Sequence, residues 1–178
     1  MELVKTYDSK EFISKFAEFK NEGANLFKTK SELFFCLKIQ DGGHLKYPIP
    51  PSILSCHTIL FITSGIYNIK VGYEKYTVKS NEIIIVPAGH IFSIDTVDIK
   101  LEGIICQVHP DFLIGKYRSQ EKINNFDFLK TKETTHVCFQ DREAGFVLNL
   151  LNRLETEYNE NGSANLDIIY PYTIALLA

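Results

Sequence analysis

Residues 57–95 read HTILFITSGIYNIKVGYEKYTVKSNEIIIVPAGHIFSID and place four apolar runs between turn signals. Apolar and polar side chains alternate over 67–71 and again over 75–79, which is typical of strands with one buried face. The run 83–86 is apolar on both faces and therefore indicates a strand inside a closed structure. The turn spacing predicts an antiparallel strand meander that closes into a barrel or a double-sheet jelly roll.

The strands and turns of this stretch follow a recognisable order. An apolar run ends at Gly65, an alternating strand leads to a turn at Gly72, and a second apolar run precedes the turn Pro87-Ala88-Gly89. This order resembles the cupin-like barrel that forms the N-terminal half of AraC-type transcription regulators. The resemblance implies a mainly β fold with an α appendix, in which a cupin-like antiparallel β-barrel (jelly roll) is followed by two C-terminal helices.

The resemblance covers roughly residues 25–178 and implies a function as well as a fold. It implies an effector-sensing and dimerisation domain of a transcription regulator, with DNA binding carried by a C-terminal helix-turn-helix region. No part of this chain resembles that region. The apolar pattern over 174–178 stops without a cap or a charged last turn, so we expect a sequence truncated before a DNA-binding domain.

We expect three parts along the chain. Residues 1–24 are an N-terminal helix or arm, residues 25–139 the cupin-like β-barrel, and residues 140–178 a helical dimerisation segment. Within the first part, Phe12 and Phe16 share one face of a short helix that begins after Ser9. We favour a helix packed on the barrel over a mobile regulatory arm.

The hydrophobic period changes from two to between three and four at Asp141, which predicts an amphipathic helix up to Tyr158. A second helical pattern begins at Leu166. The first stripe is too wide for one barrel face to cover, so we predict a homodimer formed by a two-fold pairing of these helices. The alternative is that both helices pack only on each other and on the barrel. The candidate interface residues are Phe146, Leu150, Leu151 and Leu154.

Metal ligands are sparse where cupins carry them. In metal-binding cupins a His-x-His pair and a Glu precede the position of Gly65, and a further His follows the proline turn. Here the stretch 52–58 holds only His57, and Phe92 stands at the later position, close to His90. A protein-bound first-row metal needs at least three ligands. We therefore expect no metal and no other cofactor, and structural or surface roles for both histidines.

The alternation of side chains along the strands suggests which residues would face an effector inside the barrel. In AraC-type regulators that hold a ligand in the barrel, inward residues of the strands around the conserved glycine and the proline turn line the pocket. Carried onto this sequence, the resemblance implicates Ser64, Phe92, Ile94, Glu102 and Ile104. Only Ser64 and Glu102 could orient a polar group, which suits a small, mostly apolar molecule or no ligand at all. The alternative for each position is plain barrel core.

Composition limits the other functions. The net charge of −3 argues against a nucleic-acid surface on these residues. No signal peptide or membrane-spanning run is found, and the four cysteines lack CxxC spacing. Three of them sit in apolar strands, which favours a reducing cytoplasm, with a disulfide framework as the alternative.

Two further function classes stay open beside the sensing domain. One is a small cupin enzyme, such as an isomerase or dioxygenase, and the other is a ligand-free structural binding module. We expect no enzymatic activity, because the sequence offers neither a metal triad nor a convincing acid-base pair of carboxylates. Glu74 and Glu82 lie in predicted turns, where a solvated surface position is the simpler interpretation.

Overall fold

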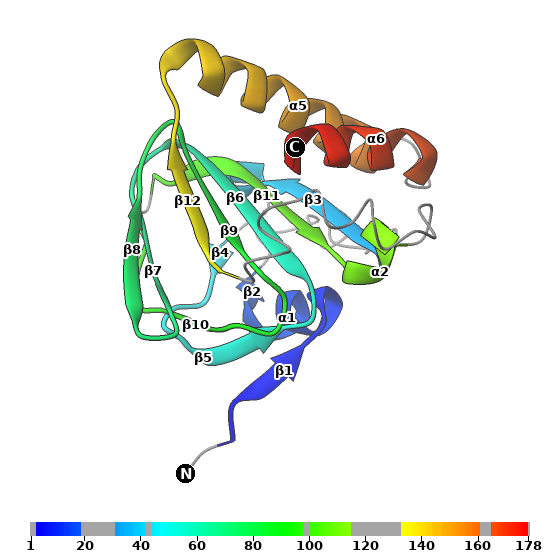
Figure 1. The fold of residues 1–178 in the computed structure, drawn as a ribbon. Helices are drawn as coiled ribbons and strands as arrows, with labels where there is room; N and C mark the ends of the chain where they lie inside the picture. The colour runs from blue at the N-terminus through cyan, green and yellow to red at the C-terminus, as the bar shows by residue number, and fades with distance from the viewer. Residues whose placement is uncertain are drawn as a thin grey trace.

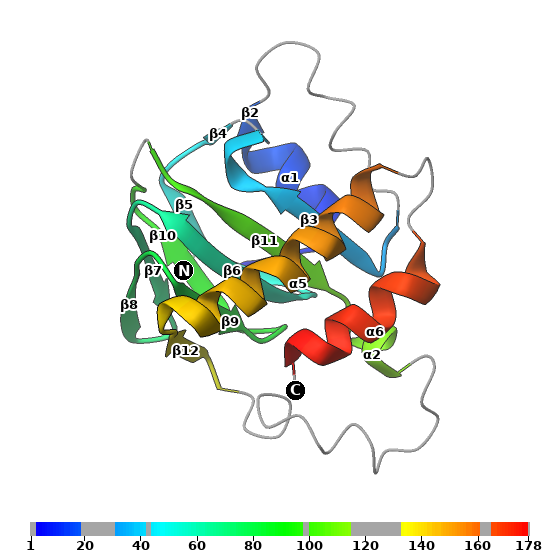
Figure 2. The same cartoon turned by 90° about the horizontal axis from the view of Figure 1, so that it is seen from above.

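The computed structural model describes residues 3–18, 31–41, 44–97, 100–114, 133–160 and 165–177. Two five-stranded sheets face each other, and two long helices cover the outer face of one of them (Figures 1 and 2). The prediction of a mainly β fold with C-terminal helices is confirmed. The described strands form two separate sheets and not one closed barrel, so the predicted barrel closure is not confirmed.

One sheet lies away from the long helices and has the order β1-β5-β10-β7-β8. Its strands are β1 (Lys5–Tyr7), β5 (Ile49–Leu54), β10 (Ile91–Ile94), β7 (Tyr67–Val71) and β8 (Glu74–Val78). All its neighbouring strands are antiparallel except β1 and β5, which run parallel. A separate two-stranded sheet pairs β2 (Ala17–Glu18) with β4 (His44–Leu45).

The other sheet, here called the helix-side sheet, has the order β12-β9-β6-β11-β3 and is antiparallel throughout. Its strands are β12 (Thr135–Cys138), β9 (Glu82–Val86), β6 (His57–Ser64), β11 (Glu102–Val108) and β3 (Phe34–Lys38). The 3-10 helix η2 (Ile39–Asp41) follows β3, and the short helix α2 (Pro110–Ile114) follows β11.

The predicted meander is corrected in one respect. β6 pairs with β9 and β11, whereas the β7–β8 hairpin belongs to the opposite sheet. The chain therefore changes sheets after Ser64 and again after Val78. Gly65 makes the first change with a φ of +89°, where a Cβ atom would also lie 3.1 Å from the Leu101 backbone. The alternation of apolar and polar side chains predicts that a segment is a strand, but it does not predict which other strand pairs with it.

The N-terminal helix packs on the protein, as favoured from the sequence. Helix α1 (Ser9–Phe16) buries Phe12, Ile13 and Phe16. Its N-cap is Asp8 instead of Ser9, because the Asp8 carboxylate accepts a hydrogen bond from the Glu11 N–H at 2.7 Å in a capping box.

The C-terminal helices α5 (Asp141–Asn159) and α6 (Leu166–Leu177) form a core with the helix-side sheet. Leu151 and Leu154 are fully buried in that core, so the structure does not offer them as dimer contacts. For these two residues the alternative of packing within the chain holds. Phe146 is 60% exposed, and Leu150 is half-buried. Among the residues described, we find no helix that combines the length and the apolar character needed to cross a membrane.

The candidate ligand cavity

A cavity lies between the two sheets, and Phe12 of α1 forms part of its wall. The space open to the centre of a water molecule measures about 40 Å³. One water needs roughly 10–15 Å³ on this measure, so the cavity admits a few water molecules or a small organic group. Its walls are mostly apolar and come from both sheets. The lining residues are Phe12, Leu45, Leu54, Cys56, Thr58, Tyr67, Ile69, Val86, Pro87, His90, Phe92, Ile94, Ile105 and Gln107.

Strand alternation explains how these residues reach the cavity. Residues two apart on one strand point to the same face, and β7, β10 and β11 each supply such a pair. The β10 pair is Phe92 and Ile94, and the β11 pair is Ile105 and Gln107. Phe12 of α1 packs against Phe92 with ring centroids 5.8 Å apart. The helix therefore contributes directly to the cavity wall.

Gln107 is the polar residue that stands out in this wall. Its side chain is 3% exposed, and its Oε1 atom has no hydrogen-bond partner among the described residues. It lies opposite Thr58 on β6, which also lines the cavity. A buried amide oxygen without a partner costs about 1–3 kcal/mol. An orphaned acceptor beside a cavity is therefore a binding point for a hydrogen-bond donor.

Two histidines hold the turn at one end of the cavity. The Ala88 N–H donates to His57 Nδ1 at 3.1 Å, and His90 Nδ1 lies 3.2 Å from the Pro87 carbonyl oxygen. The pKa of His57 is lowered to about 4, mainly by burial and in smaller part by the neighbouring His109 and His90. His57 is therefore neutral at pH 7, with its proton on Nε2.

The tyrosines at and near the cavity are uncharged at neutral pH. Burial raises the pKa of Tyr47 to about 12. Burial, and then the proximity of Tyr47, raises the pKa of Tyr67 above its usual range. Both hydroxyls thus stay protonated, and none of the lining residues is Lys, Arg, Asp or Glu. In the described part of the chain, no group of three His, Cys, Asp or Glu side chains is arranged to hold a metal ion.

The structure brings two of the five predicted ligand residues to the cavity. Phe92 and Ile94 line it. Ser64 and Glu102 are exposed register partners at the end of the β6–β11 pair, and Ile104 is buried on the helix side of its sheet. None of these three residues lines this cavity, and a role for them in ligand binding stays a prediction.

The reason for the difference is that β11 is covered on both faces. It lies between the opposite sheet and α5, so its apolar residues do not reveal which face points inward. A register shift between Glu102 and Gly103 also separates Glu102 from the regular part of the strand. The signal that sequence reasoning missed is Gln107, the lone amide in the apolar run 104–108.

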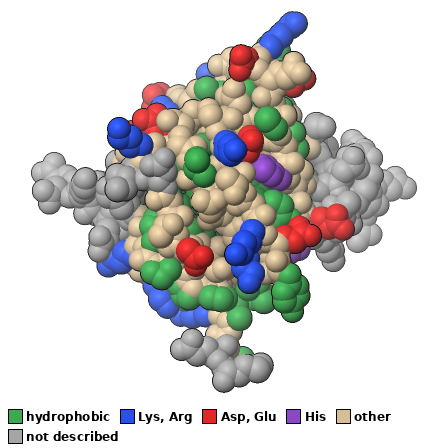
Figure 3. Space-filling model, turned by 90° about the vertical axis from the view of Figure 1, so that its left-hand side faces the viewer, with side chains coloured by type: hydrophobic (Ala, Val, Ile, Leu, Met, Phe, Trp, Pro, Cys, Tyr) green, Lys and Arg blue, Asp and Glu red, His purple; other side chains and the backbone are tan. Residues whose placement is uncertain are grey.

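The surface gives no support to nucleic-acid binding on the side that Figure 3 shows. Basic, acidic and apolar side chains are interspersed there, over the region of β7 and β8. Phosphate binding requires Lys and Arg to gather locally. On this face the mixed pattern is that of an ordinary solvent-facing surface.

No protein-family model matches the sequence, and no curated protein matches it either. Solved structures do resemble it. An apo form of ToxT from Vibrio cholerae shares 11% identity over 79% of this chain and 54% of its own, with a TM-score of 0.49. The AraC-like transcriptional activator CuxR shares 12% identity over 69% of this chain and 42% of its own, with a TM-score of 0.44.

Another similar structure is the EutQ protein of Clostridium difficile, with 19% identity over 46% of this chain, 60% of its own and a TM-score of 0.35. AraC-like regulators are thus among the structural neighbours of this chain, which spans about half the length of the ToxT and CuxR chains. At these identities and TM-scores, the matches give the chain neither a family nor an activity.

Proposed function

We propose that this chain is the effector-sensing module of a cytoplasmic AraC-type transcription regulator and binds a small, neutral, mostly apolar molecule between its two sheets. The observation that carries the proposal is the unpartnered Oε1 atom of Gln107 at the wall of an apolar cavity. The resemblance of the sequence over 57–95 to AraC-type regulators supports the class of protein that we propose.

The chemistry of the wall defines the ligand. An acceptor without a partner calls for a hydroxyl or amide N–H donor on the ligand. The absence of Lys and Arg from the lining disfavours an anion, because a buried carboxylate needs a cation or several donors. The remaining wall is apolar and matches an aliphatic or aromatic body.

The size of the cavity limits the ligand further. An engineered apolar cavity of about 150 Å³ takes up benzene, whereas this cavity measures about 40 Å³. The unliganded form therefore accommodates only a few non-hydrogen atoms. A larger ligand would have to displace a wall residue, and Phe12 is the wall residue supplied by α1.

A strand shared by the cavity and the helices offers a route for the signal. β11 presents Ile105 and Gln107 to the cavity. On its other face Cys106 and Val108 belong to the core formed with α5 and α6. A ligand that shifts β11 would thus also shift the packing of both helices.

We assign the output to these helices. In the proposal, α5 pairs with its counterpart in a second copy through the exposed Phe146 and the half-buried Leu150, and DNA is bound only by a region beyond this chain. The proposal includes no catalytic step. A small cupin enzyme and a ligand-free structural binding module are the alternatives, and no feature of the cavity favours either.

The ligand class can be tested with three probes of the same shape. Isopropanol, acetone and acetate share the same number of non-hydrogen atoms, but only isopropanol is a neutral donor. We expect saturable binding of isopropanol by NMR titration, with an affinity at least tenfold above that of acetate. Tighter binding of acetate would contradict the proposal. The coding sequence after Ala178 tests the regulator class: a helix-turn-helix region supports it, and a different following domain contradicts it.

A further inference from the structure

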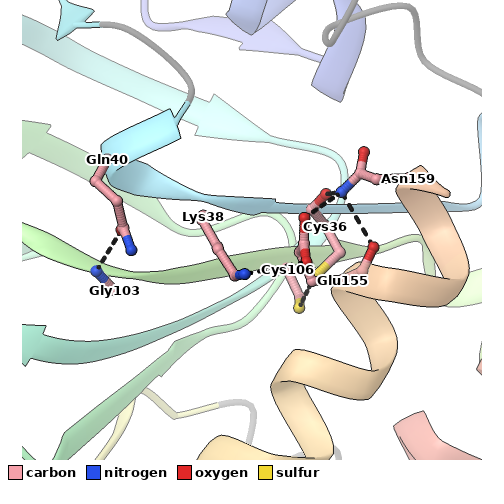
Figure 4. Close-up of polar contacts among 7 residues, drawn as sticks. All are labelled: Cys36, Lys38, Gln40, Gly103, Cys106, Glu155 and Asn159. Carbon is pink, nitrogen blue, oxygen red and sulfur yellow. Dashed lines mark hydrogen bonds and ion pairs between the residues drawn. The ribbon is translucent and has the colours of Figure 1, made fainter.

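Two cysteines face each other across neighbouring strands of the helix-side sheet. Cys36 of β3 and Cys106 of β11 are register partners in an antiparallel pair. Their Sγ atoms lie 2.9 Å apart (Figure 4). Both side chains are completely buried, and both are free thiols.

The pairing of the two strands suits a disulfide. Directly opposed residues of antiparallel strands have Cα atoms about 4.5–5.5 Å apart, and disulfides span Cα separations of about 4.4–6.8 Å. An S–S bond measures about 2.04 Å, so the two sulfur atoms would need to approach by roughly 0.9 Å. A small rotation of the two side chains would bring the sulfur atoms this much closer.

The C-terminal end of α5 lies directly over this pair (Figure 4). Asn159 Nδ2 donates to the Cys36 carbonyl oxygen at 3.2 Å and to Glu155 Oε1 at 2.9 Å. Lys38 Nζ, two residues further along β3, lies 3.6 Å from Glu155 Oε2. The thiol pair therefore sits at the point where α5 is tied to the sheet.

We propose that Cys36 and Cys106 are a reversible modification site, which forms a cross-strand disulfide on reaction with a small disulfide such as oxidised glutathione. The thiolate of one cysteine attacks a glutathione sulfur and releases one glutathione thiolate. The second cysteine then attacks the mixed disulfide and releases the other. The two cysteines lose two protons and two electrons, and oxidised glutathione becomes two molecules of reduced glutathione.

Burial makes this reaction slow and selective. It raises the pKa of the Cys36 thiol, and the neighbouring Cys106 thiol raises it further. Because the thiolate is the reacting form, few molecules react at any moment. Among the described strands, β3 is an edge strand of its sheet and pairs only with β11 there, so a local opening that frees β3 from one strand would admit the reagent. The inference is independent of the ligand proposed for the cavity.

The test is an equilibrium measurement in glutathione redox buffers. The chain with Cys138→Ser, which removes the one described exposed thiol, is equilibrated at graded ratios of oxidised to reduced glutathione, quenched with acid and analysed by intact mass. We expect a loss of two hydrogen atoms, with peptide mapping that joins Cys36 to Cys106. The folded chain should reach half-oxidation at a ratio at least tenfold more reducing than the same chain in concentrated guanidinium chloride, because only folding holds the thiols together.

A variant that lacks one of the two cysteines provides the control for this test. Cys36→Ser should abolish the two-hydrogen loss in the folded chain, and the peptide map of the unsubstituted pair gives the same answer if this variant does not fold. A folded chain that oxidises no more readily than the denatured one would overturn the proposal. So would a disulfide that joins Cys56 to either partner.

Discussion

Gln107 places an unpaired amide oxygen in a mostly apolar wall. The loss of folding stability that this causes can be measured. Gln107→Leu removes the unpaired Oε1 and keeps a side chain of similar length, so we expect the free energy of unfolding of the unliganded chain to rise by about 1 kcal/mol. The same change at Gln40 should lower it by about 1 kcal/mol, because Gln40 Oε1 accepts a hydrogen bond from the Gly103 N–H at 3.2 Å. Urea unfolding of both variants measures the contrast, and a clear loss of stability in Gln107→Leu would contradict it.

His57 predicts a pH dependence of stability. Unfolded His57 takes up a proton near its ordinary pKa of about 6.5, whereas folded His57 does so only near 4. Protonation at Nδ1 also removes the acceptor of the Ala88 N–H. Its contribution is therefore complete above about pH 6.5 and declines as the pH falls towards 4, by about 3 kcal/mol in total.

Urea unfolding across this pH range measures the effect of His57 by comparison with His57→Gln. The glutamine keeps an acceptor for the Ala88 N–H and does not titrate. The wild-type chain should therefore lose more stability than the variant as the pH falls. Equal pH profiles for the two chains would contradict a buried neutral imidazole.

At the scale of the elements, hydrophobic periodicity predicted the secondary structure of each segment better than its position and partners in the sheets. The alternation over 67–71 and the helical repeat from Asp141 to Tyr158 correspond to β7 and α5. The partners of β6 were not predictable, because pairing depends on contacts between segments far apart in sequence. The inward face of β11 was not predictable either, because helices cover one side and the cavity the other.

Two glycines test the fold of β11 and α5, because one lies in a crowded place and the other in an open one. A Cβ atom on Gly103 would lie 2.2 Å from the Phe61 carbonyl oxygen, within the central pair of the helix-side sheet. We expect Gly103→Ala to lower the free energy of unfolding by at least about 3 kcal/mol. Gly145 of α5 has open space around it, so Gly145→Ala should raise the free energy by about 1 kcal/mol. Equal effects in thermal unfolding would show that the β6–β11 register is wrong.

At the scale of the whole molecule, the prediction to test is that the chain dimerises through the exposed face of α5. Leu151 is unsuitable for the test because it is fully buried, and a charge there would unfold the chain. Phe146 is 60% exposed and has the Arg142 guanidinium 5.9 Å from its ring centroid. If the chain dimerises through this face, Phe146→Glu should shift light scattering from dimer to monomer. A wild-type chain that stays monomeric at about 100 μM would contradict the dimer.

The most direct measurement of the proposed ligand chemistry is an NMR titration with isopropanol and acetone, which differ in whether they donate a hydrogen bond. We expect isopropanol to shift the Gln107 side-chain amide and the backbone amides of Phe92 and Ile94 in a saturable manner. Acetone should bind at least fivefold more weakly, since its oxygen cannot donate to Gln107 Oε1. In Gln107→Leu, the preference for isopropanol should disappear. Equal binding of both probes to the wild-type chain, or shifts confined to residues outside the cavity, would contradict a donor-binding site at Gln107.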